Sequence, residues 1–142
     1  MTIVRSLPAL EELRFGSENL TDSNLDCLER LRSLRVLMLW GQIGDAGVEK
    51  LSRLPKLTEL LISSPNVSDD GLKNLARLET LEKLTLSSST ITDAGVCELS
   101  RLSGLKQLYL DRIPGISEEC LDGLREARSG IAIVNEPYGP PP

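Results

Sequence analysis

Leucine recurs along this chain at a spacing of 23 or 24 residues, and this repetition restricts the fold more than any other feature. The segment Leu54 to Arg77, LPKLTELLISSPNVSDDGLKNLAR, is followed directly by LETLEKLTLSSSTITDAGVCELSR, which has the same pattern. Repeats of this length are typical of solenoids, in which each unit buries its apolar residues against its neighbours. We predict five units, near residues 7–30, 31–53, 54–77, 78–101 and 102–127.

Within each unit the apolar residues follow first the spacing of a strand and then that of a helix. In the third unit, Leu60 and Ile62 are two residues apart, so both should point to the same face of a short strand. Further on, Leu72 and Leu75 are three residues apart, which is typical of one helix face. Stacked units should therefore form a curved parallel sheet with helices on its outer side.

Each predicted helix begins with an acid, which in four of the five units follows a hydroxyl-bearing residue. These pairs are Thr21-Asp22, Gly44-Asp45, Ser68-Asp69, Thr92-Asp93 and Ser117-Glu118. We expect the hydroxyls to cap the helices and the acids to lie near the positive ends of the helix dipoles. Glycine follows at Gly47, Gly71 and Gly95, where the missing side chain should let neighbouring units approach closely.

The Leu-x-x-Leu-x-Leu core and the following ITDAG, Ile91 to Gly95, resemble the leucine-rich repeat family. The resemblance covers residues 7–127 and implies an α/β solenoid of horseshoe shape, with the sheet on its concave side and short helices on its convex side. Two branches are similar, the bacterial repeats with a TDAGL helix start and the cysteine-containing repeats of F-box proteins. The second branch has cysteine after the strand, where this chain has Glu18, Pro65 and Ser89, so the bacterial type fits better.

The resemblance implies a non-enzymatic module that binds a protein or peptide on its concave sheet. One alternative is a structural segment of a larger protein or oligomer that makes its contacts through an open N-terminal edge. Another is the substrate-receptor module of an F-box-type ubiquitin ligase, which would need an adaptor-binding segment that is not recognisable in these residues. The partner itself is not indicated by the repeats.

Composition argues against several other kinds of function. The net charge of −5 and the low aromatic content of 3% do not favour nucleic-acid binding. No apolar run approaches the roughly 20 residues that span a membrane, and the N-terminus does not resemble a signal peptide. We therefore expect a soluble protein, with no membrane partner and a cytoplasmic location.

Residues that commonly carry catalysis are also missing. The chain has no histidine, no nucleophile in a G-x-S-x-G turn and no phosphate-binding glycine pattern, so we expect neither catalysis nor a cofactor. Cys27, Cys97 and Cys120 are odd in number and lack C-x-x-C spacing. They therefore predict no zinc site and no disulfide framework, but free thiols in a reducing compartment.

At the C-terminal end, the segment IAIV at residues 131–134 is predicted to be a last strand that closes the sheet. Its Ile133 lies 23 residues beyond Leu110, about one repeat further along the chain. The domain should then cover residues 1–135, and the proline-rich tail 136–142 is expected to be disordered.

At the N-terminal end, Val4 and Leu7 lie 24 residues before Leu28 and Leu31, so the chain is expected to begin within the end of another helix. Solenoids usually end in a polar cap. The missing cap suggests either a longer repeat array or an edge that pairs with something, including a second copy of the chain.

The strand pattern also predicts which side chains point away from the core, in three columns across the sheet. The first column is Glu12, Val36, Glu59, Lys83 and Gln107, the middle one is Arg14, Met38, Leu61, Thr85 and Tyr109, and the third is Gly16, Trp40, Ser63, Ser87 and Asp111. Most of these residues are small or charged.

Four apolar residues nevertheless gather on two adjacent strands, and we refer to Val36, Met38, Trp40 and Leu61 as the apolar patch. Clusters of this kind mark interaction sites, and tryptophan is enriched among residues that dominate binding energy. We predict that the patch binds the partner and that Arg14 and Tyr109 contribute at its flanks. Alternatively, Trp40 folds over the edge of the sheet and has no binding role.

Overall fold

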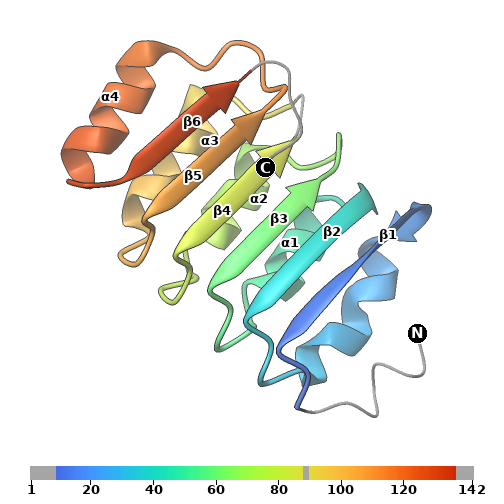
Figure 1. Ribbon diagram of the computed structural model, residues 1–142. Helices are drawn as coiled ribbons and strands as arrows, with labels where there is room; N and C mark the ends of the chain where they lie inside the picture. The colour runs from blue at the N-terminus through green and yellow to red at the C-terminus, as the bar shows by residue number, and fades with distance from the viewer. Residues whose placement is uncertain (1–8, 88–89, 137–142) are drawn as a thin grey trace.

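The computed structural model describes residues 9–87 and 90–136, which form one parallel sheet of six strands (Figure 1). The strands lie side by side in the order in which they occur along the chain. They are β1 Glu12–Thr21, β2 Val36–Gln42, β3 Glu59–Ser63, β4 Lys83–Ser87, β5 Gln107–Asp111 and β6 Ala132–Glu136. Each strand therefore pairs with those of the neighbouring units, as the repeat predicts.

A short helical segment follows each of the first five strands, and these segments lie on one side of the sheet (Figure 1). The fourth continues from an α-helix into a turn of 3₁₀-helix. The segments are η2 Asp22–Arg30, a 3₁₀-helix, α1 Asp45–Leu51, α2 Asp69–Leu75, α3 Asp93–Glu98 with η3 Leu99–Arg101, and α4 Glu118–Ala127. The opposite side of the sheet, here called the concave face, carries no helix from residues 9–87 or 90–136.

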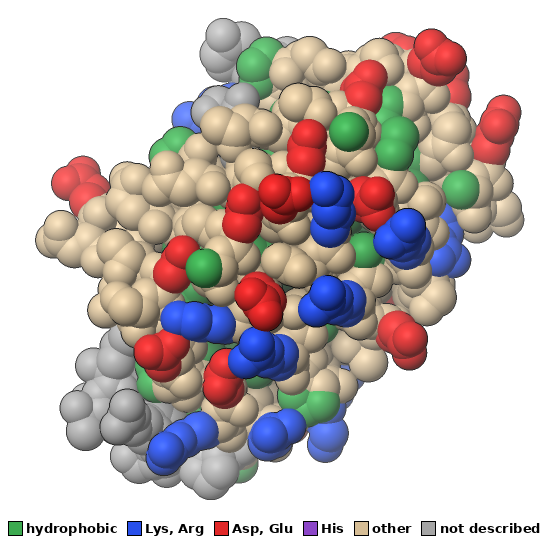
Figure 2. All heavy atoms as spheres, turned by 180° about the vertical axis from the view of Figure 1, so that it is seen from behind, with side chains coloured by type: hydrophobic (Ala, Val, Ile, Leu, Met, Phe, Trp, Pro, Cys, Tyr) green, Lys and Arg blue, Asp and Glu red, His purple; other side chains and the backbone are tan. Residues whose placement is uncertain are grey.

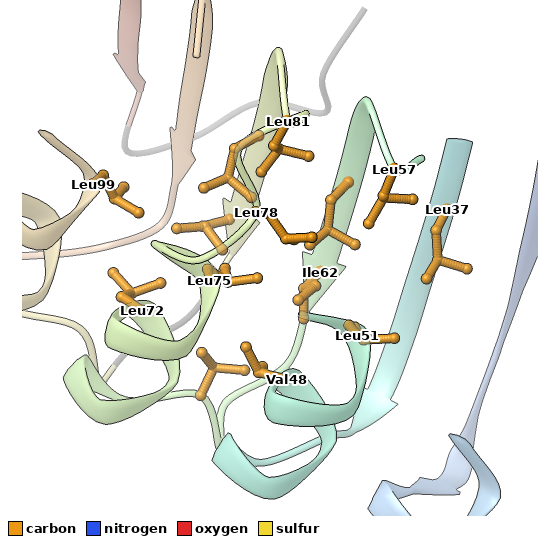
Figure 3. Close-up of a cluster of buried hydrophobic side chains, with 14 of the residues drawn as sticks. Leu37, Val48, Leu51, Leu57, Ile62, Leu72, Leu75, Leu78, Leu81 and Leu99 are labelled. Atoms are coloured by element: carbon orange, nitrogen blue, oxygen red, sulfur yellow. The ribbon is translucent and has the colours of Figure 1, made fainter. Parts of the chain in front are cut away.

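Leucine side chains fill the space between the sheet and the helices. Leu37, Leu60 and Leu84 lie beside one another on β2, β3 and β4, and all three are fully buried. Val48 and Leu72, from α1 and α2, point into the same space and are also fully buried (Figure 3). The two apolar spacings in each unit thus supply the two sides of a single continuous core.

The last strand lies at the place that the sequence indicates, but with a different pairing. The prediction placed it at residues 131–134, with Ile133 beside Leu110. In the structure β6 begins at Ala132, and Ile133 pairs with Leu108. The predicted pairing is therefore wrong by two residues.

A longer connection explains this shift. After α4 ends at Ala127, the chain turns through Gly130, whose φ of 89° lies in the left-handed region that favours glycine. Ala132 N then donates to the carbonyl oxygen of Lys106 at 2.8 Å, which sets the start of the strand. Because strand side chains alternate with a period of two, Ile133 still packs against the core.

Adjacent units are joined by hydrogen bonds between the starts of successive helices, and we refer to each such contact as an aspartate joint. Asp69 Oδ1 accepts a hydrogen bond from the backbone N–H of Thr92 at 2.8 Å, and Asp69 Oδ2 accepts one from the Thr92 hydroxyl at 2.6 Å. Hydrogen bonds to a charged group are among the stronger ones in proteins. Equivalent contacts join Asp45 to Ser68 and Asp93 to Ser117, and Asp22 accepts a bond from the backbone N–H of Gly44 at 2.7 Å.

The predicted hydroxyl caps form at only some helices. Ser68 and Ser117 each accept a hydrogen bond from a backbone N–H in the first turn, at 3.3 and 3.1 Å. Thr92 makes no such bond, so the prediction is wrong there. Its hydroxyl donates to the carboxylate of Asp69, and those of Ser68 and Ser117 likewise donate to Asp45 and Asp93. The acids, which were predicted to act only within their own helices, therefore also bind the next unit.

The repeated glycines are explained by the same joints. A Cβ atom at Gly71 would lie 2.5 Å from Oδ1 of Asp45, closer than real Cβ contacts allow. Similar contacts occur at Gly47 and Gly95. The expected close approach is therefore confirmed, and the group that comes close is the carboxylate of the preceding unit.

Residues 1–8, 88–89 and 137–142 lie outside the described part of the chain. The predictions for Val4, for Leu7 and for most of the 136–142 tail therefore fall outside it too, although Glu136 belongs to β6. None of the helices in the described ranges is long and apolar enough to cross a membrane. The same residues contain no group of three or more His, Cys, Asp or Glu side chains placed to hold a metal ion.

Candidate functional site

The three columns predicted from the sequence lie side by side on the concave face. In the first, Val36 pairs with Glu12 on one side and Glu59 on the other. In the middle column Met38 pairs with Leu61, and in the third Trp40 pairs with Ser63. The register thus brings the four residues of the apolar patch together on β2 and β3.

The four patch residues differ in how far they extend into solvent. Val36, Met38 and Leu61 are half-buried, whereas Trp40 has 48% of its surface exposed. Trp40 is the only tryptophan of the chain. Among the residues that the structure describes, it is the only large hydrophobic side chain that is exposed. The patch is therefore a partly covered apolar surface with a single prominent side chain.

The indole of Trp40 leans across β1 and lies against Gly16. A Cβ atom at Gly16 would lie 2.3 Å from Cδ2 and 2.4 Å from Cγ of Trp40, so the ring takes the place of a side chain at that position. Folding toward the sheet edge was the alternative that we considered for this residue. In the structure the ring rests on the neighbouring strand, as that alternative states, and it still exposes about half of its surface within the patch.

Charged residues of the first and middle columns adjoin the patch. Arg14 Nε lies 2.6 Å from Glu12 Oε1, and Lys83 Nζ lies 3.0 Å from Glu59 Oε1. These side chains are partly or largely exposed, so the ion pairs add little to stability. They do place charges of both signs beside the apolar residues.

The two residues predicted to flank the patch have different positions relative to it. Arg14 pairs with Met38 across β1 and β2 and therefore adjoins the patch. Tyr109 is separated from Leu61 by Thr85, which is buried. Val134 continues the middle column beyond Tyr109 on β6, a position that the sequence did not assign to the concave face.

The opposite, helical side of the molecule has a different character. Positive and negative side chains are mixed across it, with no large area of one sign (Figure 2). Neighbouring units contribute to ion pairs there, including Lys50 with Asp26 at 2.5 Å and Arg53 with Glu29 at 3.2 Å. Such a surface is typical of a solvated face, and it leaves the concave side as the better candidate site.

Comparison with known proteins agrees with this architecture. Residues 77–100, about one unit, match the family model described as Leucine Rich repeat. The other units repeat the same pattern and build one sheet, so the fold is an α/β solenoid of the leucine-rich repeat type. The predicted fold class is confirmed.

Comparisons with solved structures and with curated sequences give weaker results. The structure is similar to that of an internalin C2 from Listeria monocytogenes, with 18% sequence identity and a TM-score of 0.47, over 92% of this chain and 73% of the other. This similarity is low, and nothing about function is inferred from it. No curated protein sequence is significantly similar to the chain.

Proposed function

We propose that this protein is a non-enzymatic interaction module that binds a protein or peptide on its concave face. The observation that carries the proposal is the exposed indole of Trp40 within an apolar patch on two paired strands. Stacked repeats hold such a face rigidly, because the two patch strands, β2 and β3, each pair with two neighbouring strands. A rigid face loses little conformational entropy when a partner binds.

The chemistry of the patch suggests what it binds. Val36, Met38 and Leu61 offer partly exposed apolar surface, and Trp40 supplies the type of side chain most often found to dominate binding energy. Methionine adapts its shape to a partner more easily than branched residues do. The proposed ligand is therefore a segment that inserts an apolar side chain beside Trp40, with Arg14 at the rim available to a polar or acidic group.

A second candidate contact is the N-terminal edge of the stack. Leu13 and Phe15 on β1 occupy inward positions equivalent to Leu37 and Leu39, yet they are only partly buried whereas the latter are fully buried. A further repeat or a second chain could cover this edge. The edge is a different surface from the patch, so the two candidates can be separated by mutation.

The test is a pull-down from cells of the source organism with mass-spectrometric identification of the captured proteins. It compares the wild type with the double variant Met38→Arg, Leu61→Arg. Both side chains are partly exposed and point away from the core, so the variant should fold. A matched control, Gln107→Arg with Ala127→Arg, adds the same two charges at exposed positions outside the patch.

Each captured protein is then purified and titrated against the three forms of the chain. We expect a partner that binds the wild type and the control equally and loses most of its affinity for the patch variant. Equal binding to all three forms would reject the concave patch and direct attention to the N-terminal edge. Loss of cooperative unfolding in the patch variant would show instead that the two side chains support the core.

A further inference from the structure

Cys97 and Cys120 lie close together on the helical side of the molecule, although nothing in the concave-face proposal involves them. Cys97 is on α3 and Cys120 is near the start of α4, and their Sγ atoms are 3.2 Å apart. Their separation of 23 residues is about one repeat, which places them on neighbouring helices. Cys97 is exposed, whereas Cys120 is only 7% exposed.

From this geometry we propose that the pair is an oxidation site, at which hydrogen peroxide converts the two thiols into a disulfide that links the fourth and fifth units. A disulfide has an S–S bond of about 2.05 Å, so the sulfur atoms need to approach by little more than about 1 Å. This distance is within reach of side-chain rotation and small helix movements.

The surrounding contacts hold the start of α4, and with it Cys120, beside α3. The aspartate joint between Asp93 and Ser117 ties the start of α4 to the start of α3, through bonds of 2.9 and 2.6 Å. Ser117 Oγ also accepts a hydrogen bond from the backbone N–H of Cys120 at 3.1 Å. The Cys120 thiol itself lies 3.5 Å from the carbonyl oxygen of Asp93. Cys120 is therefore attached to a joint that is already formed in the reduced protein, and this joint ties together the two helices that carry the cysteines.

The different exposure of the two thiols gives each a separate role. Deprotonated Cys97, which peroxide can reach, attacks one peroxide oxygen, the O–O bond breaks, and hydroxide leaves as Cys97 becomes a sulfenic acid. Cys120 then attacks the Cys97 sulfur, the S–O bond breaks, and the Cys120 proton leaves with the hydroxide as water. In total two thiols are oxidised and one peroxide is reduced to two water molecules.

The environment of Cys120 agrees with its role as the second thiol. Burial, followed by the hydrogen bond and charge interaction with Cys97, raises the pKa of Cys120 to about 12. Cys120 is therefore protonated in the reduced protein and reacts poorly with peroxide directly. It becomes useful only when a sulfenic acid has formed next to it.

The experiment treats the fully reduced protein with hydrogen peroxide, unfolds it in an alkylating agent, and maps the peptides by mass spectrometry under non-reducing conditions. We expect a cross-linked peptide pair that contains Cys97 and Cys120, with Cys27 left as the one alkylated thiol. Reduction before alkylation should restore three alkylated cysteines.

Two variants separate the roles of the thiols. Cys97→Ser, an exposed substitution that the fold should tolerate, is expected to leave Cys120 alkylated after peroxide treatment. Cys120→Ala is expected to retain an oxidised Cys97 without an internal cross-link. The proposal is overturned if wild-type Cys97 is oxidised to sulfinic or sulfonic acid while Cys120 remains alkylated. It is equally overturned if the wild type forms only covalent dimers.

Discussion

A Cβ atom at Gly95 would lie 2.3 Å from the carboxylate oxygen Oδ1 of Asp69 and 2.9 Å from its Cα. The second distance involves backbone, so rotation of the Asp69 side chain alone cannot relieve the contact. We expect Gly95→Ala to lower the free energy of unfolding by about 1–3 kcal/mol, the usual cost of overpacking. Urea denaturation followed by circular dichroism measures this change.

Gly123 provides the matched control, because it also lies in a helix, α4, but a Cβ atom there would meet nothing within 4 Å. Alanine is preferred to glycine inside helices by about 0.5–1 kcal/mol, so Gly123→Ala should stabilise the protein by a similar amount. If both alanine substitutions changed the unfolding free energy equally, the close approach of Asp69 to Gly95 at the aspartate joint would be contradicted.

The joint between Asp45 and Ser68 should contribute directly to stability. Asp45 is half-buried and accepts the Ser68 backbone N–H at 2.8 Å and its hydroxyl at 2.5 Å. Because hydrogen bonds to charged groups contribute about 1.5–3 kcal/mol, we expect Asp45→Ala to lower the unfolding free energy by that amount. In a double-mutant cycle with Ser68→Ala, the coupling free energy between the two substitutions should exceed about 0.5 kcal/mol. If their effects on the unfolding free energy simply add, the two side chains do not interact directly.

The last joint predicts a dependence of stability on pH. The hydrogen bond from the Ser117 hydroxyl, and then that from its backbone N–H, lower the pKa of Asp93 below its ordinary value. A carboxylate with a lowered pKa in the folded state stabilises the protein above its unfolded pKa of about 3.9, and this contribution disappears as the pH falls through the folded pKa. The urea midpoint of the wild type should therefore exceed that of Asp93→Asn near neutral pH, and the difference should shrink below about pH 3.9. A difference that stays constant with pH would mean that ionisation of Asp93 is not its source.

Trp40 offers a direct optical test of the concave face, since it is the only tryptophan and is 48% exposed. If a partner covers the apolar patch, the emission should shift to shorter wavelength and acrylamide should quench it less. The Gln107→Arg, Ala127→Arg control should show the same shift on binding. Binding without any change in Trp40 emission would place the contact elsewhere.

The leucine pattern was sufficient to predict the sheet, its register and the outward columns. Side chains of a strand alternate between its two faces. Because Leu60 and Ile62 point to the core, the residues next to them in the strand must point to the concave face. The repeat then transfers this orientation to the neighbouring strands, which is why Met38 and Leu61 were correctly placed side by side. Only β6 was displaced, because the connection after Ala127 does not follow the length of the repeat.

Other features could not be obtained by considering one unit at a time. The helix dipole alone accounts for an acid at the start of a helix. The presence of Asp69 at such a position therefore does not indicate a hydrogen bond to Thr92 in the next unit. The spacing of Cys97 and Cys120 by about one repeat did contain a signal, since residues one repeat apart lie on adjacent units. Likewise, the contact of Trp40 with Gly16 depends on a rotamer, which no spacing determines.

The aspartate joints also bear on how a chain of this kind can grow. Each internal unit has an acid that faces forward along the stack and an N–H group, usually with a hydroxyl, that faces backward, as Asp69 and Ser68 do in the third unit. A duplicated copy of such a unit, inserted within the array, would bring both complementary halves with it. Gene duplication could therefore lengthen or shorten the horseshoe one unit at a time, without compensating changes in the units on either side.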